Sequence, residues 1–282
     1  YSYLVPDGRF PEKSSVVTRE RQVIRQLPDK SLQEAVPIGG VSVGPRDLAW
    51  MDSEPHTVTY LEALDGGDPN TTVEHRDRLI RLELEGAPQE MLRTEFRFAG
   101  LSISDSGTGF LSEYDQPSRT RRLWRMAIDD PSDKKLLWER NSEDRYGDPG
   151  TPLTMEDGQG HRLVRQNEDW IFLGGDGASD QGDRPFLDRY NIETGESERL
   201  WRAGTDSYEI MVSALDNEIT RILTRHESKT EPPNYYVLNL SNGQRTALTH
   251  FADPHPQLSG IQKRFVTYER NDGVQLSATL LL

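Results

Sequence analysis

Residues 235–248, YYVLNLSNGQRTAL, decide the fold: apolar and polar residues alternate, a turn follows at Ser241-Asn242-Gly243, and a second short stretch returns. Alternation with a period of two, interrupted by Asn and Gly, is typical of half-buried antiparallel strands joined by a tight hairpin. Asn and Gly tolerate the positive φ angles that such a turn requires. The stretch therefore predicts a β-hairpin.

The same hairpin plan occurs three more times along the chain. The copies are RLIRLELEGAPQEMLR (78–93), RLWRMAIDDPSDKKLLW (122–138) and FLDRYNIETGESERLW (186–201). Two further candidate strands precede each copy, as Ile210–Ser213 and Thr220–Thr224 precede the last one. Four strands per unit, repeated at roughly 45 to 65 residues, predict the blades of an all-β propeller.

The blades are expected to be four full ones and a partial one. Their predicted bounds are near 1–44, 45–94, 95–140, 141–203 and 204–250. Because the predicted repeats start in mid-blade, we expect sequence missing on the N-terminal side, and unpaired sheet edges that favour a homo-oligomer. The best helical candidate, Lys30–Val36, is short.

Composition and charge restrict the classes of partner and of chemistry that are expected for this chain. The 282 residues carry a net charge of -14, which argues against nucleic acid or an anionic membrane as partner. Cysteine is absent, so thiolate chemistry and disulfides are excluded. No apolar run approaches a membrane span. The N-terminal Tyr1–Leu4 stretch lacks an initiator Met and a signal pattern, and we interpret it as the interior of a longer protein.

Several linking segments are similar to those of a known family. They are ALDGGDP (63–69), HRDR (75–78), SEDRYGDPG (142–150), GDRPFLDR (182–189) and TEPPNY (230–235). They resemble the propeller of glutamyl endopeptidase-type members of the prolyl oligopeptidase family of serine peptidases, from about Ala35 onward. Residues 263–280 resemble the first strands of that family's α/β-hydrolase domain.

The resemblance implies a seven-bladed propeller that caps a catalytic domain with a Ser-Asp-His triad, screens peptides by size, and belongs to an enzyme that cleaves after Glu. We thus expect an incomplete propeller over residues 1–262, with about four to five of seven blades, and the start of a truncated hydrolase domain over 263–282.

The chain alone is expected to hold no catalytic residues, metal or cofactor, and to be inactive. Its expected partners are peptide substrates and the missing hydrolase domain. The expected compartment is the cytoplasm or the periplasm, or the plastid stroma if the protein is from a plant.

Two arginines in turn-rich loops are the candidate binding residues. A Glu side chain entering a cavity needs a cation, and Arg offers bidentate geometry. Arg145 and Arg184 both have aromatic neighbours in sequence. Since acids also surround each of them, the alternative is a structural ion pair that locks two blades together.

Other motifs are interpreted as structural. Gly40–Gly44, GVSVG, matches the G-x-S-x-G nucleophile elbow by letter, but Pro45 and a strand follow where an elbow needs a helix. Asp105, in DSGTG, lacks the second carboxylate loop of an aspartic protease and is expected in a hairpin turn.

The remaining polar clusters give no stronger signal. His250, Asp253 and His255 alternate with prolines in an extended linker, which does not have metal-ligand spacing. Gly174–Gly177 lacks the Lys of a phosphate loop, and Arg119–Arg122 suits a solvated strand face.

Two alternative functions are open at this point. One is a free-standing propeller that binds proteins. The other is a propeller glycosidase, which needs two opposed carboxylates, and no pair stands out among the 47 acidic residues.

Overall fold

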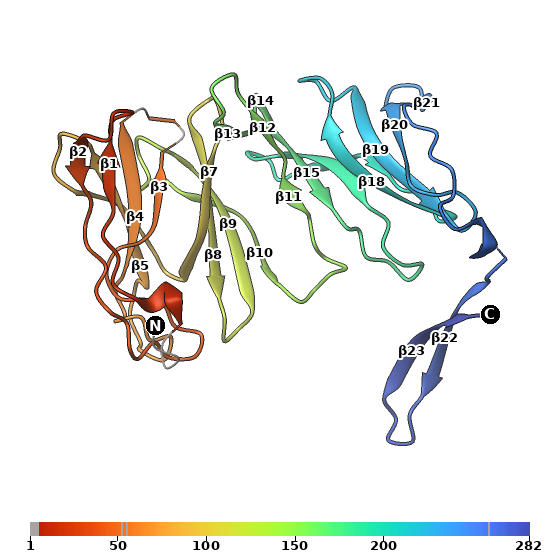
Figure 1. Ribbon diagram of the computed structural model, residues 1–282, viewed down its shortest axis with the longest axis horizontal. Helices are drawn as coiled ribbons and strands as arrows, with labels where there is room; N and C mark the ends of the chain where they lie inside the picture. Colours follow the sequence, from red (N-terminus) through yellow and green to blue (C-terminus); the bar gives the residue numbers. More distant parts are fainter. Residues whose placement is uncertain (1–5, 52, 55, 259) are drawn as a thin grey trace. The chain divides into compact units, whose positions relative to one another are not determined.

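The computed structural model describes residues 6–282 except 52, 55 and 259, so the Tyr1–Leu4 stretch lies outside the described residues (Figure 1). The chain forms two compact units, and each is described by itself. The first holds the described residues up to Asp148 with Pro152–Ile171 and Asn191–Glu196; the second holds Pro149–Thr151, Phe172–Tyr190 and Ser197–Leu282. Among the described residues there is no α-helix, and no helical segment has the length and apolar character of a membrane span.

The first unit contains two four-stranded antiparallel sheets, each with its strands in sequence order (Figure 1). The first sheet consists of β3 (Arg46–Trp50), β4 (Thr57–Ala63), β5 (Asp77–Glu83) and β6 (Gln89–Thr94). The second consists of β7 (Arg97–Ile103), β8 (Thr108–Asp115), β9 (Thr120–Ala127) and β10 (Lys135–Asn141).

Alternation along these strands gives the first sheet two buried faces. Leu61 and Leu79 belong to one apolar cluster together with Leu111 and Met126 of the second sheet. Their neighbours in sequence belong to a second cluster, which includes Val58, Tyr60, Ile80 and Leu82. The period-two pattern therefore supplies apolar side chains to both faces of one sheet.

The second of these clusters is completed by the N-terminal segment. A two-stranded hairpin of β1 (Ser15–Val17) and β2 (Val23–Gln26) contributes Val16 to this cluster. Leu27, the residue directly after β2, also belongs to it. A one-turn 3-10 helix, η1 (Asp7–Arg9), precedes the hairpin. The segment Lys30–Val36, the best but short helical candidate of the sequence, is irregular, since Pro28 and Pro37 bracket it and the Gln33 side chain donates a hydrogen bond to the Ser31 carbonyl oxygen.

A third sheet has the order β11 (Thr151–Pro152), β15 (Trp170–Gly175), β16 (Phe186–Asn191) and β17 (Ser197–Arg202), and β14 (Gln166–Asn167) also pairs with β15. The strand expected at Thr151–Thr154 is interrupted. Its end instead starts a separate hairpin of β12 (Thr154–Glu156) and β13 (Arg162–Val164). The Asp157 carboxylate fixes the turn by accepting hydrogen bonds from the backbone N–H groups of Gln159 and His161.

The second unit contains the third four-stranded sheet: β18 (Ser207–Ala214), β19 (Arg221–Ser228), β20 (Asn234–Asn239) and β21 (Arg245–Ala247), in sequence order. Gly243 has φ 69° in the turn between β20 and β21, as the hairpin signal requires. A 3-10 turn, η2 (Pro256–Leu258), comes before a two-stranded hairpin of β22 (Lys263–Glu269) and β23 (Gln275–Leu281).

The expected fold class is confirmed: the chain is all-β and built of four-stranded antiparallel sheets of the propeller-blade type. The division at residue 263 into a propeller and the start of a hydrolase domain stays a prediction.

Candidate functional site

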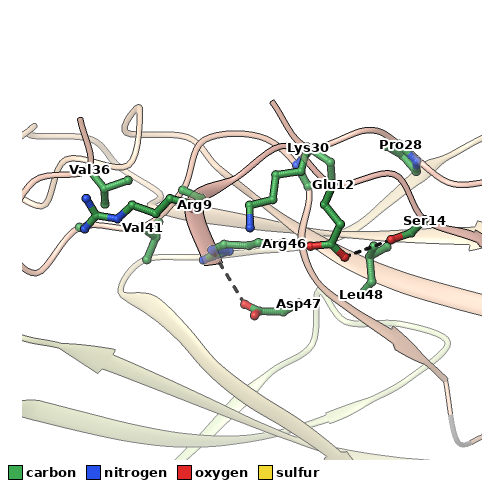
Figure 2. Close-up of a pocket in the computed structure, with 13 residues that line it drawn as sticks. Arg9, Glu12, Ser14, Pro28, Lys30, Val36, Val41, Arg46, Asp47 and Leu48 are labelled. Carbon is green, nitrogen blue, oxygen red and sulfur yellow. Dashed lines mark hydrogen bonds and ion pairs between the residues drawn. The ribbon is translucent and has the colours of Figure 1, made fainter. Parts of the chain in front are cut away.

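A cavity of about 570 Å³ in the first unit combines three cationic side chains (Figure 2). Arg9 comes from η1, Lys30 from an isolated bridge with Glu12, and Arg46 from the first residue of β3. Three separate segments of the chain therefore contribute one positive charge each.

These cations have unused hydrogen-bond donors. Lys30 donates one hydrogen bond from Nζ to the Gly8 carbonyl oxygen at 2.5 Å, which leaves two of its three N–H groups. The Arg9 guanidinium makes no side-chain hydrogen bond or ion pair with any described residue. The cavity is thus lined by donors that the described part of the chain does not satisfy.

Arg46 is the buried member of the three. Its side chain is 10% exposed, and Nη2 lies 2.8 Å from Oδ2 of Asp77, whose side chain is fully buried. Within the described residues, Nη1 of Arg46 is buried with no hydrogen-bond partner. Buried polar groups are nearly always paired, so this donor stands out.

Asp77 ties Arg46 to the second sheet. The same carboxylate accepts from Nη1 of Arg97 at 2.7 Å and from the backbone N–H of Phe98 at 2.8 Å. Arg97 begins β7, so the position of the cavity cation depends on a strand that follows it by about 50 residues.

Asp65 forms the other half of this network. It accepts from Nη2 of Arg97 at 2.5 Å and Nη1 of Arg76 at 3.0 Å. Burial alone raises the pKa of the Asp65 carboxyl, but the hydrogen bonds and charge of Arg97, with those from Gly67 and Arg76, outweigh it and hold that pKa below its usual value. The carboxylate therefore stays ionised and holds Arg97 in place.

Asp65 also supports one wall of the cavity through a glycine contact. Its Oδ1 accepts from the backbone N–H of Gly67, and the Gly67 carbonyl accepts from the N–H of Val41. A Cβ at Gly67, where φ is 78°, would lie 2.2 Å from the Val41 carbonyl oxygen, and one at Gly40 would lie 2.4 Å from the Gly67 oxygen. Only glycine permits this approach. The Gln33 side chain also accepts a hydrogen bond from the backbone N–H of Val43, in the loop that contains Val41.

Two acidic side chains also line the cavity. The Glu12 carboxylate accepts from the Ser14 hydroxyl at 3.2 Å, and Asp47 lies 3.9 Å from Nε of Arg46. Three cations against two acids leave a surplus of one positive charge in a chain whose total is -14. The arrangement can hold an oxygen-bearing anion of low charge.

Ser42 lines this cavity but is no nucleophile elbow. Residues 40–44 form an irregular loop, and strand β3 follows where an elbow needs a helix. No histidine is among the described residues that line the cavity. The interpretation of the G-x-S-x-G match as a linker agrees with this geometry.

The two predicted binding arginines lie elsewhere. Arg145 is exposed in the loop after β10, in the first unit. Arg184 is half-buried in the second unit, where Nε donates to the Ala203 carbonyl oxygen at 3.1 Å. The two belong to different units, and neither lines the cationic cavity. A role for them in substrate gating stays a prediction.

The other polar motifs occupy turns, linkers and strand faces. Asp105 lies in the β7–β8 turn, and Gly174–Gly177 runs from the end of β15 into a loop. Residues 250–255 form an irregular linker, and no group of three or more potential metal-ligating side chains occurs in the part of the chain that the structure describes. Arg122 is more buried than a solvated face would make it: its side chain is 19% exposed and pairs with Glu95 and Glu139.

Sequence reasoning missed Arg9, Lys30 and Arg46 as a set. They are separated by 20 and 15 residues of irregular sequence and short hairpin, and no motif spacing connects them. The one local signal was the Gly-rich stretch directly before Arg46, which marks a close backbone approach.

Comparison with known proteins gives two curated relatives over the whole chain. The protein of Oryza sativa subsp. japonica named probable glutamyl endopeptidase, chloroplastic, is 36% identical over 304 aligned positions. The Arabidopsis thaliana protein of the same name is 34% identical. All of this chain is covered in both cases, and it spans 32% of each relative's length. No protein-family model matches the chain.

Solved structures with a related arrangement include oligopeptidase B from Trypanosoma brucei with covalently bound antipain, at 11% identity and a TM-score of 0.48, covering 86% of this chain and 39% of that one. Oligopeptidase B from Leishmania major has 10% identity and a TM-score of 0.45, covering 83% and 38%. Both TM-scores are below 0.5, so the description of the fold rests on the strand order and not on these structures. The full-length sequence match confirms the expected resemblance: the whole of this chain is similar to proteins named as glutamyl endopeptidases, of which it spans about a third.

Proposed function

We propose that this chain is the propeller region of a serine-type peptidase, and that the whole protein cleaves peptides after Glu. The observation that carries the proposal is the 36% identity along the entire chain to a protein named as a glutamyl endopeptidase. The repeated four-stranded sheets support it, because a propeller beside a hydrolase domain restricts which peptides reach the catalytic residues.

The chain's own part in this function is to admit and position substrates. Hydrolysis by nucleophilic acyl transfer needs a nucleophile, a base and an oxyanion site in mutual contact. The Ser42 loop offers a hydroxyl, and no histidine is among the described residues that line the same cavity. We therefore expect the purified chain to be inactive.

The first experiment incubates the purified chain with Glu-containing peptides and with an activated ester. The expected result is no turnover above buffer. Turnover that disappears in Ser42→Ala would overturn the assignment of this chain to substrate admission.

The second experiment tests the whole protein. The coding sequence after Leu282 should encode a G-x-S-x-G motif followed by Asp and His, and its full-length product should cleave Glu peptides faster than matched Gln peptides. A stop codon at that point would favour a free-standing protein-binding propeller instead, and equal cleavage of both peptides would contradict the preference for Glu.

A further inference from the structure

We propose that the cavity formed by Arg9, Lys30 and Arg46 binds the carboxylate of an acidic peptide. This inference rests on the proposed function only in taking peptides as the molecules that reach the propeller. The site is distinct from the two loop arginines predicted from the sequence, neither of which lines it.

The first argument is the supply of donors. Arg9 has a guanidinium without a partner among the described residues, and Lys30 uses one of its donors on the Gly8 carbonyl. Charged donors bind carboxylates by short, strong hydrogen bonds, and Arg offers two parallel ones. Arg9 and Lys30, called the rim of the cavity below, therefore offer the charged hydrogen-bond donors that a carboxylate requires.

The second argument is the buried cation behind that rim. Nη2 of Arg46 is held by Asp77 at 2.8 Å, whereas Nη1 is buried without an acceptor among the described residues. A protein seldom buries an Arg nitrogen without giving it an acceptor. An incoming carboxylate is an acceptor of the right charge for Arg46, whose position the buried network of Asp65, Asp77 and Arg97 fixes in advance.

The third argument decides between anions. Glu12 and Asp47 line the same cavity, so a multiply charged phosphate meets two negative groups, while a single carboxylate matches the surplus of one positive charge. The wall also contains the apolar side chains of Val36, Val41 and Leu48. Such a wall suits the hydrocarbon part of an amino-acid side chain.

A peptide carries its carboxylate either on a Glu side chain or at its C-terminus. Three probes separate these sources: acetyl-Ala-Glu-Ala-amide, acetyl-Ala-Gln-Ala-amide and acetyl-Ala-Gln-Ala with a free C-terminus. Binding to the whole chain is measured by calorimetry and by NMR shifts. The first and third probes contain one carboxylate each and the second contains none. We expect at least one carboxylate probe to bind and the amide probe not to bind, and the stronger of the two identifies the source.

Variants then place the binding in the cavity. Arg9→Gln and Lys30→Gln are each expected to weaken binding about tenfold, the effect of losing one charged hydrogen bond. Arg19→Gln and Lys229→Gln remove the same charges from exposed positions that have no side-chain partner among the described residues, and these matched controls should leave binding within about twofold. Glu12→Gln removes a competing acid and should strengthen binding.

Arg46 needs a conservative variant because its ion pair is buried. Arg46→Lys keeps a charge beside Asp77 but removes the unpartnered nitrogen, so the melting temperature should change little while binding weakens several-fold. The proposal is overturned if none of the probes binds, if the amide probe binds as well as the others, or if Arg9→Gln and Lys30→Gln bind like the controls. Each of these results leaves the proposed peptidase function standing, since that function is tested separately on the full-length product.

Discussion

The four-stranded sheets and the cationic cavity are built in opposite ways. The hairpin between β8 and β9 joins residues that are close in sequence, and its pairing follows from alternating side chains and a turn. The cavity brings together Arg9, Lys30 and Arg46. Its floor, the buried Arg46 with its partner Asp77, depends on Arg97 in another sheet. The sheets are stabilised by apolar side chains that alternate along neighbouring strands, whereas the cavity is stabilised by ion pairs between residues that are far apart in the sequence. This difference predicts that single charges matter greatly at the cavity floor and little on the sheet surfaces.

Asp77→Asn tests the floor and should have the largest effect. The carboxylate is fully buried between Arg46 and Arg97, so the isosteric amide leaves two cations under-compensated. Breaking a buried pair in this way costs about 3 kcal/mol or more in the free energy of unfolding. Denaturant titration followed by tryptophan fluorescence measures the loss.

The matched control is a charge pair on a sheet surface. Glu198 lies 2.5 Å from Nη2 of Arg189, and both side chains are at least 40% exposed. Glu198→Gln should change the free energy of unfolding by about 0.5 kcal/mol or less. Equal losses for Asp77→Asn and Glu198→Gln would contradict the distinction between the two regions.

Gly67→Ala tests the cavity wall and should have an intermediate effect. Its backbone has φ 78°, and the new Cβ would meet the Val41 carbonyl oxygen. Gly243→Ala is the control, because Gly243 has φ 69° but open space around it. A left-handed alanine costs about 1 kcal/mol in both variants. Gly67→Ala should lose more than that and also weaken peptide binding. Identical losses would mean that the wall simply moves aside.

The pH dependence of Asp65 should show the smallest effect. Hydrogen bonds and the charge of Arg97 outweigh burial and lower its pKa in the folded chain. The unfolded chain then binds more protons near pH 4, so this stabilisation is present above the ordinary Asp pKa and is lost as the pH falls through the folded value. Free energies of unfolding at pH 7, 5, 4 and 3.5 should fall more steeply for the wild type than for Asp65→Asn. Parallel curves would show that Asp65 does not contribute to the pH dependence.

The extent to which sequence predicts this molecule follows the same division. The hairpin at 235–248 was predicted because its alternation and its Asn-Gly turn are contained in one short stretch, and β20 and β21 pair as expected. The β12–β13 hairpin was missed, although Asp157-Gly158 is a recognised turn signal, because its strands are only three residues long. Short strands offer too few positions for alternation to be visible.

The site was beyond sequence reasoning for a different reason. Arg145 and Arg184 were chosen because loop arginines beside aromatic residues are visible in the sequence. Arg46 instead looked like an ordinary residue after a glycine-rich linker, and nothing near it indicates that Asp77 would hold one nitrogen and leave another unpaired. Burial and pairing belong to the folded chain, so residue type alone cannot reveal them.

The dependence of the cavity floor on Arg97 also sets an order of assembly during translation. Asp65 and Asp77 leave the ribosome before Arg97 does, so the first sheet emerges with two acids that lack their shared partner. Arg46 and Arg76 are made earlier and each pair with one of these acids, but the full charge compensation is reached only when β7 has been synthesised and has docked. A nascent chain arrested before residue 97 should therefore lack an ordered cavity, and the ability to bind an anion would mark the moment at which the second sheet joins the first.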